Sequence, residues 1–176
     1  MIRTEAVRRS RRKQEIKQLY LAAFPKEDRM PFWMMVAMSY LRSTEFLAFY
    51  DKDDLCGFVY MATINRQTFV MFLAVPEALR SKGYGSQILA QVQSLHPNNK
   101  IVISIEPCDA DAKDIDLRVR RKQFYLANGY AETGCLIRLG GKTQEIIIKN
   151  GVFHIREFRL FLCGTATLQS SPGYGA

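Results

Sequence analysis

Residues 75–89 decide the fold, and they read Val75-Pro76-Glu77-Ala78-Leu79-Arg80-Ser81-Lys82-Gly83-Tyr84-Gly85-Ser86-Gln87-Ile88-Leu89. The stretch starts at the end of an apolar run, passes through a loop with two glycines one residue apart, and enters an amphipathic helix at those glycines. A strand, loop and helix in this order aim several backbone N–H groups and the positive end of a helix dipole at one spot. Such a spot binds phosphate.

The spacing of the glycines excludes two common kinds of phosphate-binding loop. A P-loop requires Gly-x-x-x-x-Gly-Lys-Ser/Thr, which does not occur here, and a dinucleotide fingerprint requires a third glycine near Ile88, which is missing. The stretch matches instead Arg/Gln-x-x-Gly-x-Gly/Ala, as Arg80-Ser81-Lys82-Gly83-Tyr84-Gly85, preceded by Val-x-x-x-x. In this motif the sequence resembles the GNAT superfamily of acyl-CoA-dependent N-acyltransferases.

A second motif strengthens the resemblance. Family members carry Phe/Tyr-Tyr-x-x-x-Gly-Phe/Tyr on the next helix, and this chain has Phe124-Tyr125-Leu126-Ala127-Asn128-Gly129-Tyr130 about 40 residues beyond the glycines. The order of the predicted elements also resembles the GNAT fold, over roughly residues 10–150.

The predicted elements before the glycines are two helices followed by three strands. A helical stripe from Ile16 to Phe24 is ended by Pro25, and Pro31 is placed to open a second helix that runs to Leu41. Two helices are therefore expected before any strong strand. Short polar turns then separate three runs rich in Phe, Val and Tyr, which predicts an antiparallel meander over residues 46–50, 55–64 and 68–75.

The predicted elements after the glycines complete a mixed sheet. A helix over 83–95 and a β-branched run over 101–105 predict a right-handed crossover and one parallel pair. A helix over 115–127, strands over 130–139 and 144–149 and a short helix within 152–162 follow. We therefore predict an α+β fold of six to seven strands, mostly antiparallel with one central parallel pair, flanked by helices. Residues 1–163 are expected to form a single domain and residues 164–176 a flexible tail.

Composition excludes several classes of protein. The chain has 176 residues with 48% hydrophobic, 24% charged and 11% aromatic content, which fits a globular domain and neither a collagen-like nor a disordered chain. The net charge is +8, and the first 14 residues hold six basic residues and one acidic residue. The longest apolar runs have seven residues, against about 20 for a bilayer span. No membrane segment and no secretion signal are expected, which favours a cytoplasmic location.

Cysteine and histidine usage argues against a metal site. The chain has no Cys-x-x-Cys pair, and its only imidazoles are His96 and His154. We expect no metal and interpret the scattered cysteines as reduced and buried: Cys56, Cys108, Cys135 and Cys163.

The resemblance implies a binding site for acetyl-CoA. The backbone from Arg80 to Ser86 would hold the diphosphate, because a β-carbon at either glycine would collide with the phosphates or forbid the turn. The strand end from Leu73 to Val75 would pair with the pantetheine arm. Arg118 stands where many members carry an Asn, so a contact with CoA is open there. The implied CoA-binding residues are Leu73, Val75, Arg80, Ser81, Lys82, Gly83, Tyr84, Gly85, Ser86 and Arg118.

Amine acetylation also needs groups that move protons. An amine with a pKa near 10.4 is neutral in only about one molecule in 2,500 at pH 7, so a base must take its proton. Tyr125 matches the family's tyrosine near the sulfur and is the predicted general acid, or else a core tyrosine. Glu106, which closes the 101–105 strand, is the predicted base, or else a partner of an arginine at 118, 120 or 121. Glu27 and Asp28 are alternatives for attracting a cationic amine.

Three functions remain open at this point. The first is an N-acetyltransferase acting on an amine by direct attack, with acetyl-CoA and an amine acceptor as partners. The second is an acyl-CoA-binding module without catalysis. The third is a nucleic-acid-binding protein that uses the basic cluster from Arg8 to Lys13, although no nucleic-acid motif accompanies it. The sequence does not identify the amine, and a homodimer stays open. The Met-rich run from Phe32 to Met38 fits either a core face or an apolar acceptor pocket.

Overall fold

The computed structural model describes residues 2–139, 141–161 and 167–169. These residues divide into two compact units. Unit 1 comprises the described residues of Met1–Thr63 and Val70–Pro97, and unit 2 those of Ile64–Phe69 and Asn98–Ala176. Strand β4 (Gln67–Ala74) contributes its first residues to unit 2 and its last residues to unit 1.

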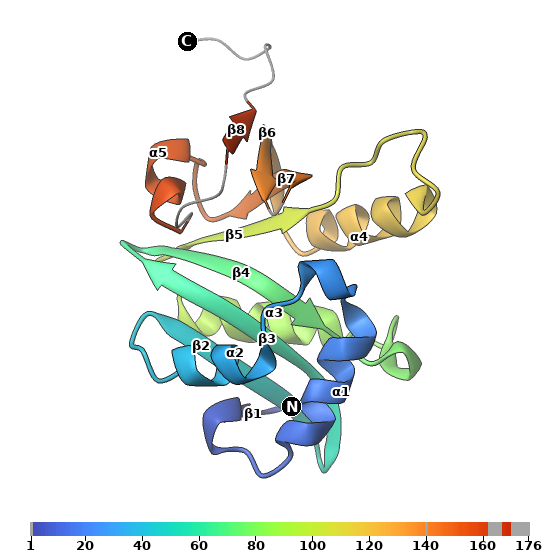
Figure 1. The fold of residues 1–176 in the computed structure, drawn as a ribbon, viewed down its shortest axis with the longest axis vertical. Helices are drawn as coiled ribbons and strands as arrows, with labels where there is room; N and C mark the ends of the chain where they lie inside the picture. Colours follow the sequence, from blue (N-terminus) through green and yellow to red (C-terminus); the bar gives the residue numbers. More distant parts are fainter. Residues whose placement is uncertain (1, 140, 162–166, 170–176) are drawn as a thin grey trace. The chain divides into compact units, whose positions relative to one another are not determined.

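Unit 1 consists of four strands with helices on both faces. In chain order its elements are β1 (Arg3–Ala6), η1 (Val7–Arg9), α1 (Lys13–Ala23), η2 (Lys26–Asp28), α2 (Phe32–Met38), β2 (Thr44–Asp51), β3 (Asp54–Ile64), the end of β4, η3 (Glu77–Leu79) and α3 (Tyr84–Leu95). The strand order is β1-β2-β3-β4, and β2 is antiparallel to both β1 and β3. Helices α1 and α2 lie on one face of the strands and α3 on the other (Figure 1).

An aromatic core joins α1 and α2 to the strands of unit 1. Tyr20 of α1 is fully buried and makes edge contacts with Phe58 of β3 and Phe72 of β4, at centroid distances of 6.0 and 5.3 Å. The Tyr20 hydroxyl donates to the Met30 carbonyl at 3.1 Å and accepts from the Met30 N–H at 2.8 Å. The loop between the helices is therefore tied to the core, and the predicted helical stripe is confirmed at Ile16 and Tyr20.

Gly57 of β3 allows α3 to pack closely on the strands. A β-carbon at this position would lie 2.5 Å from the Ala74 carbonyl oxygen and 2.7 Å from Ile88 Cδ1. The first of these atoms belongs to backbone, which cannot rotate away. We expect Gly57→Ala to lower the free energy of unfolding by about 1–3 kcal/mol in urea denaturation, as overpacked cores do. An unchanged free energy of unfolding would contradict this packing.

Unit 2 is built around strands that are rich in β-branched residues. It holds the start of β4, β5 (Lys100–Ile105), α4 (Ile115–Ala127), β6 (Ala131–Leu139), β7 (Lys142–Lys149), α5 (Ile155–Phe158), η4 (Arg159–Phe161) and β8 (Thr167–Gln169). The strand order is β4-β5-β7-β6-β8, with β4 and β5 parallel and the other pairs antiparallel. The Lys100 N–H donates to the Arg66 carbonyl at 3.0 Å, where the parallel pair begins.

The predicted fold class is confirmed, and three details differ. The sheet is mixed with one parallel pair and is flanked by helices, as expected. The sequence did not predict the short polar strand β1, which precedes both helices. Helix α2 ends at Met38 and not at Leu41. Within the predicted tail, residues 167–169 form β8 beside β6, while residues 164–166 and 170–176 lie outside the described residues. The domain boundary at residue 163 stays a prediction.

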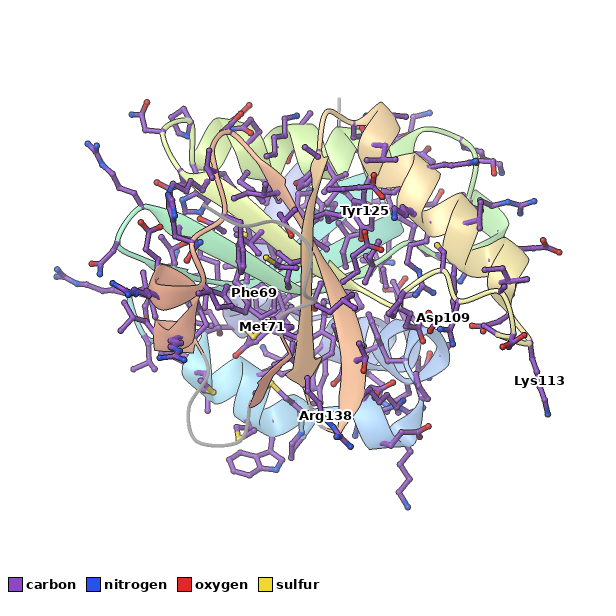
Figure 2. All side chains as sticks on the ribbon, turned by 90° about the horizontal axis from the view of Figure 1, so that it is seen from above. Phe69, Met71, Asp109, Lys113, Tyr125 and Arg138 are labelled. Atoms are coloured by element: carbon purple, nitrogen blue, oxygen red, sulfur yellow. The ribbon has the colours of Figure 1, made fainter. Side chains whose placement is uncertain are left out.

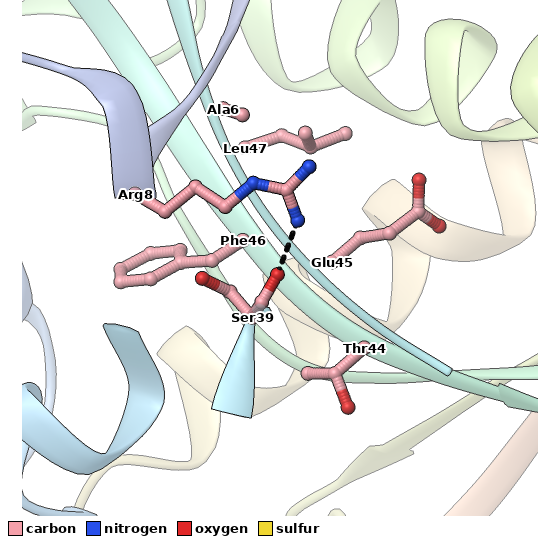
Figure 3. Close-up of a pocket in the computed structure, with 7 residues that line it drawn as sticks. All are labelled: Ala6, Arg8, Ser39, Thr44, Glu45, Phe46 and Leu47. Carbon is pink, nitrogen blue, oxygen red and sulfur yellow. Dashed lines mark hydrogen bonds between the residues drawn. The ribbon is translucent and has the colours of Figure 1, made fainter. Parts of the chain in front are cut away.

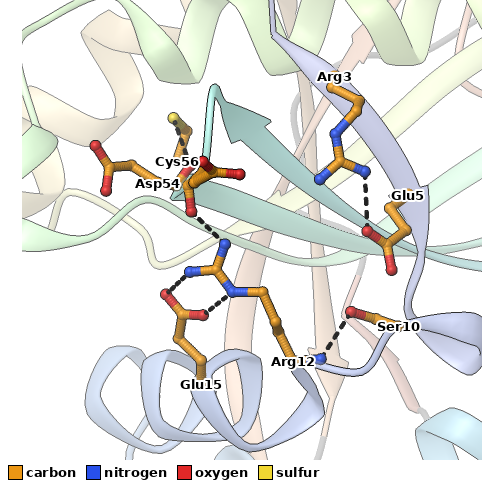
Figure 4. A network of polar contacts seen from close by, with 8 residues as sticks. Arg3, Glu5, Ser10, Arg12, Glu15, Asp54 and Cys56 are labelled. Carbon is orange, nitrogen blue, oxygen red and sulfur yellow. Dashed lines mark hydrogen bonds and ion pairs between the residues drawn. The ribbon is translucent and has the colours of Figure 1, made fainter.

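The basic N-terminal segment makes contacts inside unit 1. Arg3 and Arg12 cover the ring of buried Tyr50, with guanidinium carbons 4.8 and 4.9 Å from its centroid. Arg12 also forms a two-pronged ion pair with Glu15 at 2.7 and 2.9 Å and donates to the Asp53 carbonyl (Figure 4). Arg8 donates to the Ser39 carbonyl and Lys13 to the Ser10 carbonyl. Much of the predicted basic cluster therefore has a structural role.

The cysteines are free thiols wherever the structure describes them. Cys56 is buried as predicted, whereas the prediction of burial is wrong for Cys108 and Cys135, which are half-buried; Cys163 lies outside the described residues. Within the described ranges, no three His, Cys, Asp or Glu side chains are grouped to hold a metal ion. No helix in the same ranges has the length and apolarity to cross a bilayer.

Candidate active site

The loop before α3 is built on two left-handed residues. Ser81 has φ 60° and Gly83 has φ 84°, so the chain reverses sharply just before the helix. Gly83 is the N-cap of α3, and no side chain in the described part of the chain caps the helix. The first intrahelical bond runs from the Gln87 N–H to the Gly83 carbonyl at 3.1 Å. Helix geometry leaves the N–H groups of the preceding turn without an intrahelical acceptor, which is the arrangement an anion requires.

The space in front of Gly83 is open. Apart from its two chain neighbours, a β-carbon built on this residue would meet no atom of the described residues within 4 Å. The glycine is therefore required by its left-handed backbone and not by crowding from the protein. Arg80 and Lys82, which precede Gly83 in the loop, are exposed. The role of this loop in holding a diphosphate stays a prediction.

Tyr84, the first residue of α3, is bonded to strand β2. Its hydroxyl donates to Asp51 Oδ2 at 2.9 Å, and this hydrogen bond is the main cause that raises the Tyr84 pKa to about 12. The sequence placed Tyr84 in the phosphate loop but gave no indication of Asp51, because the two residues are 33 positions apart.

The predicted pantetheine-binding segment lies at the end of β4. The strand ends at Ala74, which is buried, while Leu73 and Val75 are half-buried. Val75 follows the strand and Pro76 then turns the chain into η3. The contact of Leu73 and Val75 with a pantetheine arm stays a prediction.

Tyr125 lies near the end of α4 in unit 2 (Figure 2). Its ring is 6% exposed and makes edge contacts with Phe124 and Tyr130, at centroid distances of 5.1 and 5.7 Å. Burial raises the Tyr125 pKa to about 12, and the charge of Arg121 opposes this rise. The phenol is therefore protonated at neutral pH, as a proton donor must be. Tyr125 also packs as a core ring, which is the other interpretation that the sequence allowed. Packing of the ring is compatible with proton donation by the hydroxyl.

Glu106 and Arg118 both have partners near α4. Glu106 forms an ion pair with Arg121, one of three arginines that the sequence left open. Arg118 donates to Asp114 Oδ1 at 2.8 Å and to the Pro107 carbonyl at 3.1 Å, which fixes the start of α4. The acidic stretch before the helix thus neutralises a neighbouring arginine, while Asp109 and Lys113 are exposed (Figure 2). The roles of Glu106 in catalysis and of Arg118 in CoA binding stay predictions.

The other residues predicted to bind the amine acceptor lie in unit 1. Glu27 and Asp28 form part of the exposed η2 turn. In α2, Met35 is fully buried in the core and Phe32 packs against that core, whereas Trp33 is 71% exposed. The Met-rich helix is therefore chiefly a core face, which is the first of the two interpretations that the sequence allowed.

A small hollow in unit 1 is not the donor site. Its volume is about 90 Å³, and it is lined by Ala6, Arg8, Ser39, Thr44, Glu45, Phe46 and Leu47 (Figure 3). Arg8 crosses it to donate to the Ser39 carbonyl at 2.5 Å. Ligand pockets usually measure about 300–1,000 Å³, so the hollow holds a few water molecules at most.

A mixed sheet with one parallel pair and a glycine-started helix after β4 is the arrangement expected of an acyl-CoA-dependent acyltransferase. The model of the acetyltransferase (GNAT) family matches residues 13–115, which is more than half of the chain. The chain belongs to the GNAT acetyltransferase family. The matched range contains the loop from Arg80 to Ser86 and ends before Tyr125.

Solved structures share the fold at low sequence identity. A protein from Bacteroides thetaiotaomicron, described as a GNAT-family acetyltransferase, has a TM-score of 0.73 and 15% identity over 92% of this chain and 93% of its own. An aminoglycoside 6′-N-acetyltransferase complexed with coenzyme A has a TM-score of 0.69 and 17% identity over 85% of this chain and 96% of its own. The ribosomal-protein-S18-alanine N-acetyltransferase from Escherichia coli has a TM-score of 0.63 and 12% identity over 88% of this chain and 96% of its own. No curated protein matches the sequence.

Proposed function

We propose that the protein is an N-acetyltransferase that transfers an acetyl group from acetyl-CoA to a primary amine by direct attack. The observation that carries the proposal is the start of α3, where a left-handed glycine leaves the first turn uncapped and open in a chain of this family. Related folds have been solved with coenzyme A, which supports the same donor here.

The donor-binding role is assigned to the loop of unit 1. The backbone from Arg80 to Ser86 supplies N–H groups and the positive end of the α3 dipole to the diphosphate. The exposed side chains of Arg80 and Lys82 add positive charge at the same place. When bound, acetyl-CoA supplies an activated thioester carbonyl.

The proton-transfer roles are assigned to unit 2. Tyr125 holds its hydroxyl proton at neutral pH, because burial raises its pKa to about 12, and it gives that proton to the departing thiolate. Glu106 is oriented by its ion pair with Arg121. A carboxylate has two oxygens, so the one outside the ion pair can accept the amine proton through water.

An acyl-CoA-binding module without catalysis is the second candidate. Both candidates use the same donor loop, but only the N-acetyltransferase would turn over acetyl-CoA. The basic N-terminal segment gives the nucleic-acid hypothesis little support, because Arg8, Arg12 and Lys13 are bonded to the protein itself. A cytoplasmic location stays a prediction, a homodimer stays open, and the amine is not identified.

Calorimetric titration with acetyl-CoA tests the proposal. We expect saturable micromolar binding, with far weaker binding of adenosine diphosphate and NAD, both of which lack the pantetheine arm and its thioester. Release of CoA thiol in the presence of a panel of primary amines then separates an enzyme from a binding module. A folded sample that binds no acetyl-CoA would overturn the proposal.

A further inference from the structure

The first turn of α3 has little to hold it in place locally. Tyr84 is flanked by Gly83 and Gly85, and glycine gives the backbone its widest conformational freedom. Among the described residues no side chain caps the helix, and a β-carbon at Gly83 would touch none of them within 4 Å apart from its chain neighbours. An anion site made of backbone N–H groups works only if those groups are held in a fixed direction.

The hydroxyl of Tyr84 supplies a restraint from outside the helix. It donates to Asp51 Oδ2 at 2.9 Å. Asp51 is the last residue of β2 and pairs with Asp54 across a tight hairpin whose Lys52 is left-handed, with φ 53°. The hydrogen bond therefore connects the flexible glycine-rich turn to the closed end of a β-hairpin. Its donor is retained over the physiological range, since the Tyr84 pKa is raised to about 12.

We propose that the hydrogen bond between Tyr84 and Asp51 positions the first turn of α3 for the diphosphate of acetyl-CoA. The inference rests on the proposed donor, and it gives the side chain of Tyr84 a role that the motif does not: the tyrosine acts through the backbone that it anchors. Tyr84 is thus a positioning residue. Its loss affects the affinity for acetyl-CoA and leaves the chemical step unchanged.

Removal of the hydroxyl tests the restraint directly. We expect Tyr84→Phe to weaken acetyl-CoA binding by about three- to tenfold, the size of the net contribution of a typical intramolecular hydrogen bond. The KM for acetyl-CoA rises by the same factor and kcat is unchanged. Tyr40→Phe is the matched control, because Tyr40 lies two residues beyond α2 and is 67% exposed, and it should leave both constants at their wild-type values.

Variants of Asp51 separate the hydrogen bond from the charge. Asp51→Ala removes the acceptor and should match Tyr84→Phe, whereas Asp51→Asn keeps an acceptor oxygen and should bind acetyl-CoA nearly as wild type does. Because both residues act through one bond, the double variant Tyr84→Phe with Asp51→Ala should be no weaker than either single variant.

The outcomes distinguish this inference from the function on which it rests. Absence of acetyl-CoA binding by folded wild-type protein overturns the proposed function. Wild-type binding together with unchanged binding by Tyr84→Phe overturns the positioning role alone. Additive losses in the double variant, a fall in kcat at constant KM, or equal losses in Asp51→Asn and Asp51→Ala also overturn it. Thermal unfolding of each variant verifies that binding is measured on folded protein.

Discussion

Tyr125→Phe is expected to lower kcat for acetyl transfer by at least about a hundredfold, the usual size of a general-acid contribution. The substitution removes the proton that the departing thiolate takes and keeps the ring. The contacts of that ring with Phe124 and Tyr130, at 5.1 and 5.7 Å, do not need the hydroxyl. The fold and the affinity for acetyl-CoA should therefore change little.

Steady-state kinetics with a saturating amine measures this effect. Tyr130→Phe is the matched control, because Tyr130 is a buried ring neighbour whose hydroxyl has no hydrogen-bond partner among the described residues. It should retain wild-type kcat. Wild-type kcat should also show no loss due to Tyr125 near pH 10, since the acid form persists to about pH 12. Full activity of Tyr125→Phe would remove Tyr125 from the proton-transfer step.

The elements of the fold could be predicted where local patterns are strong. Alternating apolar runs bounded by polar turns gave β2, β3 and β4, and Pro25 ended α1 close to its predicted boundary. Strand β1 was missed because its four residues, Arg3-Thr4-Glu5-Ala6, are too short and polar to show an apolar face. Its pairing with β2 and the bond from Gln91 of α3 to the Ile2 carbonyl are tertiary contacts, which no local pattern contains.

The candidate site also has features that the sequence predicts and features that it does not. The loop at Gly83 could be predicted because a left-handed backbone is a local requirement that glycine meets. The partners of its side chains could not. Arg118 and Arg121 lie on one helix within one turn, so spacing alone did not show that Glu106 pairs with Arg121. Asp51 had no motif at all, and only the folded hairpin brings it to Tyr84.

Gly85→Trp is expected to weaken acetyl-CoA binding by at least about a hundredfold, or about 2.7 kcal/mol, because the indole would cover the anion site. Gly85 is the second residue of α3, within the turn whose N–H groups lack intrahelical acceptors. Side chains in a helix lean toward its N-terminus, so a large group at Gly85 lies over those N–H groups. Gly85 is half-buried, so part of its surface faces solvent.

Calorimetry of the variant protein tests this expectation, with thermal unfolding measured on the same samples. Ala90→Trp is the control, because it adds the same indole to an exposed position of the same helix and should bind acetyl-CoA as wild type does. Loss of binding in Gly85→Trp alone, at an unchanged unfolding temperature, places the diphosphate at the start of α3. Wild-type affinity in Gly85→Trp would mean that the donor binds elsewhere, and the motif from Arg80 to Gly85 would then be only the turn that starts a helix.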